Sequence, residues 1–145
     1  MRRQFTYPAV VERDQSGRFL VTFPDLPGAA TDGKSIEEAL IEAADCLEEA
    51  IANLIALEEE IPKPSRAKRG QHLIATPAKM AAKAALYLAI QEAGISKSEL
   101  ARRIGCDVRE VRRLLDPLHA SKVDRIEQAL AAVGQCLAVE MRAIP

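Results

Sequence analysis

The segment from Ser96 to Leu115 constrains the fold more than any other part of the chain. Ser96 and Asp107 are residue types that cap helix N-termini, and they stand eleven positions apart. A glutamate follows each of them three residues later, which is the pattern of a capping box. Gly105 lies between the two caps, where its access to positive φ permits a tight turn. The segment therefore predicts two short helices in a helix-turn-helix arrangement.

The second predicted helix of this pair is cationic. Arg109, Arg112 and Arg113 fall on or near one of its faces. Arginine donates paired hydrogen bonds to guanine edges and neutralises phosphates, whereas a generic helical hairpin would use such charges only for solvation. The caps, the glycine and the spacing together favour DNA binding. The candidate DNA-binding residues are Lys97, Ser98, Arg109, Arg112, Arg113 and Lys122.

The two halves of the chain carry opposite charge. Residues 1–61 hold 5 Lys and Arg against 13 Asp and Glu, a net charge of −8, and residues 62–145 hold 15 against 8, a net charge of +7. The basic half suits a polyanion and the acidic half suits a basic protein surface. We therefore expect two domains with different partners, 1–76 and 77–145, the first including a basic connector at 62–71.

The acidic half has the pattern of an α+β domain with one long helix. Runs at 5–12 and 18–23 are rich in β-branched and aromatic residues and flank a polar loop, which indicates a hairpin. Pro8 places the first run at a sheet edge or a bulge. Short strands are also compatible with residues 29–31 and 72–75. A helix is expected over 35–57, capped by Ser35 and Glu38, with an apolar face of Ile36, Leu40, Ala43, Leu47, Ile51 or Ala50, and Leu54.

The basic half is predicted to be all-helical. Apolar periodicity places helices near 78–93, 97–104, 107–115 and 121–133, with glycines at three of their ends. The tail at 135–142 alternates in a way that permits a C-terminal strand. Such a strand has no partner in a helical domain, so pairing with a second copy would satisfy its edge.

The residue inventory argues against an enzyme and against a metal or other cofactor. The three cysteines form no CxxC motif, and only two histidines are present. Asp14, Asp25 and Asp32 lie in predicted turns, where aspartate commonly makes local hydrogen bonds. Free thiols, together with the lack of a signal peptide and of a membrane-length apolar run, favour the cytoplasm.

The whole chain resembles the HicB antitoxins in their helix-turn-helix variant. The N-terminal resemblance lies in the hairpin, in the loop Phe23–Gly28 and in residues 31–40. The C-terminal resemblance lies in residues 85–87, 96–105 and 111–117, together with His119. It implies a partial ribonuclease-H-like domain with a sheet of three or four strands, which masks a HicA-type mRNA-cleaving toxin. It also implies a C-terminal domain that forms a homodimer, compatible with further assembly into tetramers, and represses its own operon at operator DNA.

The loop between the second strand and the long helix is the candidate toxin-binding segment. Its two prolines lower the cost of ordering it, and we expect Leu26 to be held outward between them. The candidate residues are Phe23, Pro24, Asp25, Leu26, Pro27 and Gly28. Two other functions remain open: a stand-alone transcription factor with a ligand-sensing N-terminal domain, and a nuclease that uses the acidic loops.

Overall fold

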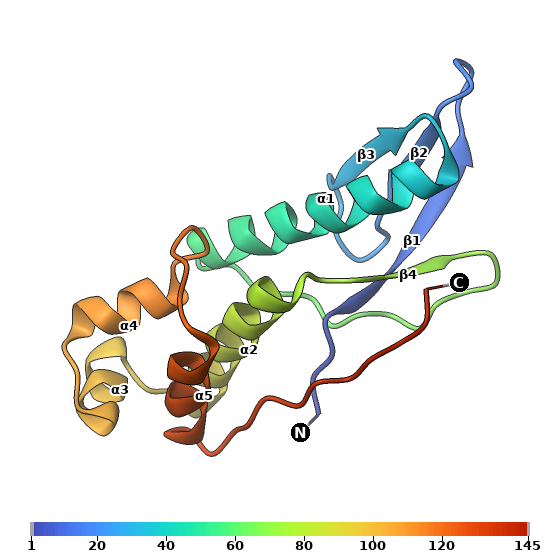
Figure 1. The fold of residues 1–145 in the computed structure, drawn as a ribbon. Helices are drawn as coiled ribbons and strands as arrows, with labels where there is room; N and C mark the ends of the chain where they lie inside the picture. The colour runs from blue at the N-terminus through green and yellow to red at the C-terminus, as the bar shows by residue number, and fades with distance from the viewer. Residues whose placement is uncertain (1, 145) are drawn as a thin grey trace. The chain divides into compact units, whose positions relative to one another are not determined.

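The structure, a computed structural model, describes residues 2–144 and divides into two compact units. The first extends to Ala81 and combines a four-stranded antiparallel sheet with one long helix, and the second begins at Ala82 and is helical (Figure 1). The predicted α+β class is therefore confirmed. Among the described residues, no helix is both long enough and apolar enough to cross a membrane.

The sheet of the first unit has the strand order β3-β2-β1-β4, and all its neighbours are antiparallel. Strand β1 divides its pairing, because its first four residues pair with β4 and its last four pair with β2. The last strand in sequence therefore closes the sheet beside the first. The strands are β1 (Thr6–Arg13), β2 (Phe19–Thr22), β3 (Ala30–Gly33) and β4 (His72–Ala75).

Pro8 lies in a central strand, so the expectation that its strand forms a sheet edge is wrong. Pro8 pairs with Leu73 of β4, whereas pairing with β2 begins only at Val10. At Pro8 itself, one side of β1 is therefore unpaired. A residue without a backbone N–H is tolerated at such a position, because no ladder hydrogen bond has to be made there.

Helix α1 (Ile36–Ala56) lies along one face of the sheet (Figure 1). Its hydroxyl cap is the predicted one, since Ser35 Oγ accepts a hydrogen bond of 3.1 Å from the Glu38 amide. The Glu38 carboxylate accepts instead from the Lys34 amide, one residue before the cap. The first turn is therefore anchored from both sides of Ser35.

The buried face of α1 differs from the predicted one. Its buried residues recur at steps of four: Ala39, Ala43, Leu47, Ile51 and Ile55. Ile36 is exposed, and Leu40 and Leu54 are only half-buried. The close approach of Gly33 explains the difference at the start of the helix, because a Cβ on Gly33 would lie 2.4 Å from the Ala39 amide nitrogen. The start of the helix thus packs through small residues.

The second unit consists of four helices, of which α2 begins within the last residues of the first unit. Their bounds agree with the sequence prediction except that α4 begins one residue later, after its cap Asp107, and α5 is shorter at both ends. The core of the last three helices includes Leu100, Val111, Leu114, Ile126 and Leu130, all buried. The helices are α2 (Ala78–Ala93), α3 (Lys97–Ile104), α4 (Val108–Leu115) and α5 (Val123–Ala131).

The tail after α5 forms no strand over residues 135–144 in the single chain. Of its alternating apolar side chains, Leu137 is half-buried, whereas Val139 and Met141 are 98% and 96% accessible; Ile144, beyond this alternation, is 91% accessible. The strand that the sequence permits here is therefore absent in the isolated chain, as expected for a segment whose hydrogen-bonding edge has no partner.

Candidate functional site

The turn between α3 and α4 is built as the sequence predicts. Ser96 Oγ accepts from the Glu99 amide at 3.0 Å, and the Asp107 carboxylate accepts from the Glu110 amide at 3.0 Å. Gly105 adopts the left-handed conformation, with φ of 69°, and ends α3. A residue with a side chain would be strained there. The two helices thus form a helix-turn-helix unit with fixed ends.

The glutamates of these two caps do not complete the capping boxes. The Glu99 carboxylate accepts hydrogen bonds from Arg102 at 2.6 Å and Arg103 at 3.0 Å, and these lower the pKa of Glu99 to about 2. The Glu110 carboxylate accepts from Arg125 of α5 at 2.8 Å. Ion pairing with arginine therefore replaces the expected contact with the cap amide.

The cationic face of α4 remains free of such pairing. Arg109, Arg112 and Arg113 are exposed, and none of them forms an ion pair with another residue in the range 2–144. Val111 and Leu114 of the same helix are buried. Three guanidinium groups that retain all their side-chain donors are thus presented from one short, firmly packed helix. We call Arg109, Arg112 and Arg113 the α4 arginines.

The other three candidate DNA-binding residues lie at helix starts of the same unit. Lys97 and Ser98 occupy the first turn of α3, where Ser98 is exposed and Lys97 is half-buried. Lys122 is exposed and precedes α5 without making a side-chain cap hydrogen bond. Amide groups at helix starts and exposed ammonium groups are both suited to phosphate oxygens.

Lys83 is a buried polar residue that the sequence analysis did not single out. It lies in α2 with 4% of its surface exposed, and its Nζ donates three hydrogen bonds within the second unit. Burial lowers the pKa of Lys83, and the negative charge of Asp116 opposes that effect. The only local signal for it in the sequence is a lysine within an otherwise apolar stretch of α2.

In the first unit, the loop that precedes β3 is more buried than expected. Leu26 is 6% exposed, so the expectation that it projects outward between the two prolines is wrong. The loop folds back through two successive turns, with the Leu26 amide bonded to the Phe23 carbonyl and the Ala29 amide bonded to the Leu26 carbonyl, each at 3.1 Å. These turns direct Leu26 and Phe23 inward and leave Pro24, Pro27 and Gly28 exposed.

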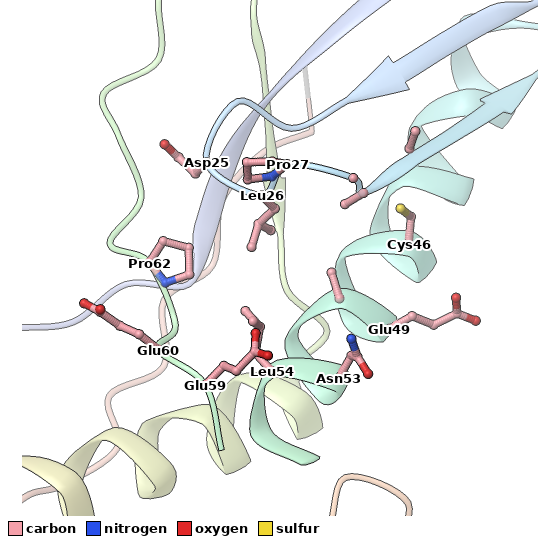
Figure 2. Close-up of a pocket in the computed structure, with 14 residues that line it drawn as sticks. Asp25, Leu26, Pro27, Cys46, Glu49, Asn53, Leu54, Glu59, Glu60 and Pro62 are labelled. Atoms are coloured by element: carbon pink, nitrogen blue, oxygen red, sulfur yellow. The ribbon is translucent and has the colours of Figure 1, made fainter. Parts of the chain in front are cut away.

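An open groove of about 1010 Å³ lies between this loop, α1 and the segment that follows α1. Leu26 and Pro27 approach it from the loop, and Glu49 comes from α1 (Figure 2). Glu59 and Glu60 follow α1 and lie across the groove from the loop (Figure 2). Apolar side chains and carboxylates therefore line it together. We call it the acidic groove.

The connector at 62–71 is fixed to the sheet of the first unit. The Tyr7 hydroxyl donates to the Pro62 carbonyl at 2.7 Å, and the Asp25 carboxylate accepts from the Ser65 amide at 2.9 Å. The connector then leads into β4, which pairs with β1. Burial, with the nearby charge of Asp25, raises the pKa of Tyr7 to about 12.

The aspartates of the loops have local roles. Asp14 accepts hydrogen bonds from Ser16 and from the Arg18 amide, and Asp32 pairs with the Arg18 side chain at 2.8 Å. Both interactions lower the pKa of the carboxyl concerned. Within residues 2–144, no group of three or more His, Cys, Asp or Glu side chains is arranged to hold a metal ion.

The two units together define a class of protein: a small α+β module followed by a helix-turn-helix module. The second helix of that module presents arginines that form no ion pair within residues 2–144. A family described as the HicB-like antitoxins of bacterial toxin–antitoxin systems matches residues 6–85. The chain therefore belongs to the HicB-like antitoxin family.

Similarity to individual members extends over nearly the whole chain. The chain is 37% identical to Antitoxin HicB 2 of Photorhabdus laumondii, over 94% of its own length and 96% of the relative's. It is 36% identical to Antitoxin HicB of Escherichia coli K12, over 93% and 98%. It is 32% identical to Antitoxin HicB of Pseudomonas fluorescens, over 93% of both chains.

Proposed function

We propose that this protein is a non-enzymatic antitoxin that binds and inhibits a HicA-type mRNA-cleaving toxin and represses its own operon at operator DNA. Membership of the HicB-like antitoxin family carries the first part of the proposal. The unpaired α4 arginines carry the second, because guanidinium groups without intramolecular partners are available to phosphates and base edges. The free thiols of Cys46, Cys106 and Cys136 suit a reducing cytoplasm.

The first unit is the proposed toxin-binding unit. The first unit as a whole has a net charge of −3, its residues 1–61 have a net charge of −8, and the acidic groove places several of these carboxylates beside apolar surface. Opposite charge speeds the encounter with a basic protein, and apolar contacts prolong the complex. The accessible residues of the loop, Pro24, Asp25, Pro27 and Gly28, would contact the toxin, while Phe23 and Leu26 hold the loop in shape from beneath.

The second unit is the proposed operator-binding and dimerisation unit. Helix-turn-helix proteins commonly read two half-sites as two-fold symmetric dimers. The exposed apolar alternation of Val139 and Met141 is the segment that a second copy would cover. Tetramers would then form by contact between first units of two dimers.

The test is co-expression with the gene adjacent to this one, which the proposal requires to encode the toxin, followed by two measurements on the purified protein. One is suppression of mRNA cleavage by the toxin, and the other is binding to a duplex that spans the promoter of the operon. The proposal requires both activities in one chain. Operator binding without any effect on the toxin would favour the stand-alone transcription factor, and metal-dependent RNA cleavage by this protein alone would favour the nuclease.

A further inference from the structure

The C-terminal end of α4 is held by a buried ammonium group. Lys83 Nζ lies 3.1 Å from the Arg113 carbonyl, 3.0 Å from the Leu114 carbonyl and 2.9 Å from Ser121 Oγ. An ammonium group has three N–H donors, so these contacts use its full capacity. The last carbonyls of a helix have no partner inside the helix, and they form the negative end of its dipole. A positive charge is therefore well placed there.

Ser121 completes this arrangement. Its hydroxyl accepts from Lys83 and donates to the Arg113 carbonyl at 3.3 Å. The Asp116 amide also donates to the Arg113 carbonyl, at 3.2 Å. The Arg113 carbonyl therefore accepts hydrogen bonds from Lys83, Ser121 and Asp116, and Arg113 is one of the α4 arginines. The backbone at this end of the cationic helix is thus fixed by residues from α2 and from the loop after α4.

We propose that Lys83 is a positioning residue for DNA recognition: by holding the carbonyls of Arg113 and Leu114, it sets the orientation in which α4 presents its arginines. This inference rests on the proposed operator binding. Lys83 is itself too buried to contact a phosphate, so its influence passes through α4. Without its ammonium group, the buried Leu114 carbonyl would lose this donor and the Arg113 carbonyl would lose one of its three donors, so the last turn of α4 would rearrange to reach water or other donors.

The experiment compares Lys83→Met with Lys79→Met in the full-length protein. Lys79 is an exposed residue of the same helix, so each variant loses one positive charge from α2. Affinity for the operon's promoter duplex is measured by fluorescence anisotropy over a range of salt concentrations. Lys83→Met should weaken binding by about tenfold, as expected for a residue that acts without touching the ligand, whereas Lys79→Met should change it less than about twofold.

The salt dependence separates a positioning role from a phosphate contact. Each lost phosphate contact lowers the slope of log affinity against log salt by about 0.9, so Lys83→Met should keep the slope of the unmodified protein. Amide chemical shifts in the free variant should change mainly at residues 112–121. Equal binding by a folded Lys83→Met variant, or a reduced salt slope, would overturn the inference.

Ser121→Ala provides a second variant if Lys83→Met fails to fold, as circular dichroism would reveal. It removes one partner of the ammonium group from a half-buried position, and a loss of about threefold in operator affinity is expected. Unchanged affinity in folded Ser121→Ala, when Lys83→Met is unfolded, would reduce Lys83 to a residue of the core and overturn the positioning role. Absence of promoter binding by the unmodified protein would instead contradict the proposed function itself.

Discussion

At the residue scale, one side-chain hydrogen bond helps to hold the connector against the sheet. The Tyr7 hydroxyl of β1 donates a hydrogen bond to the carbonyl of Pro62, the first residue of the connector. Tyr7→Phe removes only that donor and should lower the free energy of unfolding by about 1 kcal/mol, measured by urea denaturation at neutral pH.

The same tyrosine should make stability depend on pH in the alkaline range. Its pKa is raised to about 12 from an ordinary value of 10, so the folded protein holds this proton more tightly than the unfolded chain. The corresponding stabilisation is complete below pH 10 and is lost as the pH rises toward 12. Tyr7→Phe should lack this alkaline loss. An identical alkaline profile in both proteins would contradict the assignment.

Glu99 should control stability at the acidic end. Its pKa is lowered from 4.5 to about 2 by Arg102 and Arg103, so its stabilising effect is complete above pH 4.5 and lost as the pH falls toward 2. Between these values, Glu99→Gln should show a flatter decline of the urea midpoint than the unmodified protein. The difference should shrink in high salt because Glu99 is only half-buried and its partner Arg102 is exposed.

The matched control for Glu99 is Glu127→Gln, which removes an exposed carboxylate from α5 that forms no ion pair within residues 2–144. Its acid profile should follow that of the unmodified protein. If the two variants behave alike, the arginine pairs of α3 contribute nothing specific to acid stability.

At the scale of helices and strands, the cationic surface of α4 is the element on which operator binding should depend. Replacement of Arg109 and Arg112 by alanine should weaken promoter binding by about 1–3 kcal/mol for each residue that contacts a base edge. Arg66→Ala with Arg69→Ala is the control, because it removes the same charge from exposed positions of the connector in the first unit. Fluorescence anisotropy that shows equal losses for both pairs would refute the recognition-helix assignment.

Elements whose ends carry local chemical signals could be predicted from the sequence. Ser96, Gly105 and Asp107 mark helix ends through hydrogen bonds and φ angles that involve only near neighbours, and the structure has the helices there. The buried face of α1 could not be predicted in full, because it depends on the approach of Gly33 to Ala39, a tertiary contact.

In the candidate sites too, features set by neighbours in sequence could be predicted, whereas features set by distant residues could not. The arginines of α4 could be found from helical spacing alone, and the structure leaves them exposed. The inward direction of Leu26 follows from turns that the two prolines do not specify. The role of Lys83 was missed, because its acceptors lie 30 or more residues away in sequence and are backbone groups. Sequence patterns carry no direct signal for such contacts.

At the scale of the whole molecule, the exposed tail predicts that the active protein is a dimer. Deletion from Gln135 onward removes the exposed side chains of Val139, Met141 and Ile144 while leaving α5 intact. Light scattering should show a dimer for the full chain and a monomer for the truncated one. The truncated chain should also bind the promoter duplex more weakly, because a monomer contacts one half-site where the dimer contacts two. A truncated chain that remains dimeric would exclude this route of assembly.

The two proposed activities should be separable by charge alone, because they belong to units of opposite charge. Glu49→Lys with Glu60→Lys reverses two carboxylates of the acidic groove, and Glu37→Lys with Glu42→Lys makes the same change at exposed positions of α1 that do not line it. These substitutions replace the Leu26→Asp change that the sequence alone would suggest, because burying a carboxylate at Leu26 would destabilise the unit as a whole.

The groove variant should bind the toxin more slowly and more weakly than the control variant, with the difference in rate narrowing as salt screens the charges. Both variants should bind the promoter duplex as the unmodified protein does, since the α4 arginines are unchanged. If both variants lose toxin binding equally, the overall charge of the protein attracts the toxin, and not the groove. If only the groove variant loses promoter binding, the two units do not act independently.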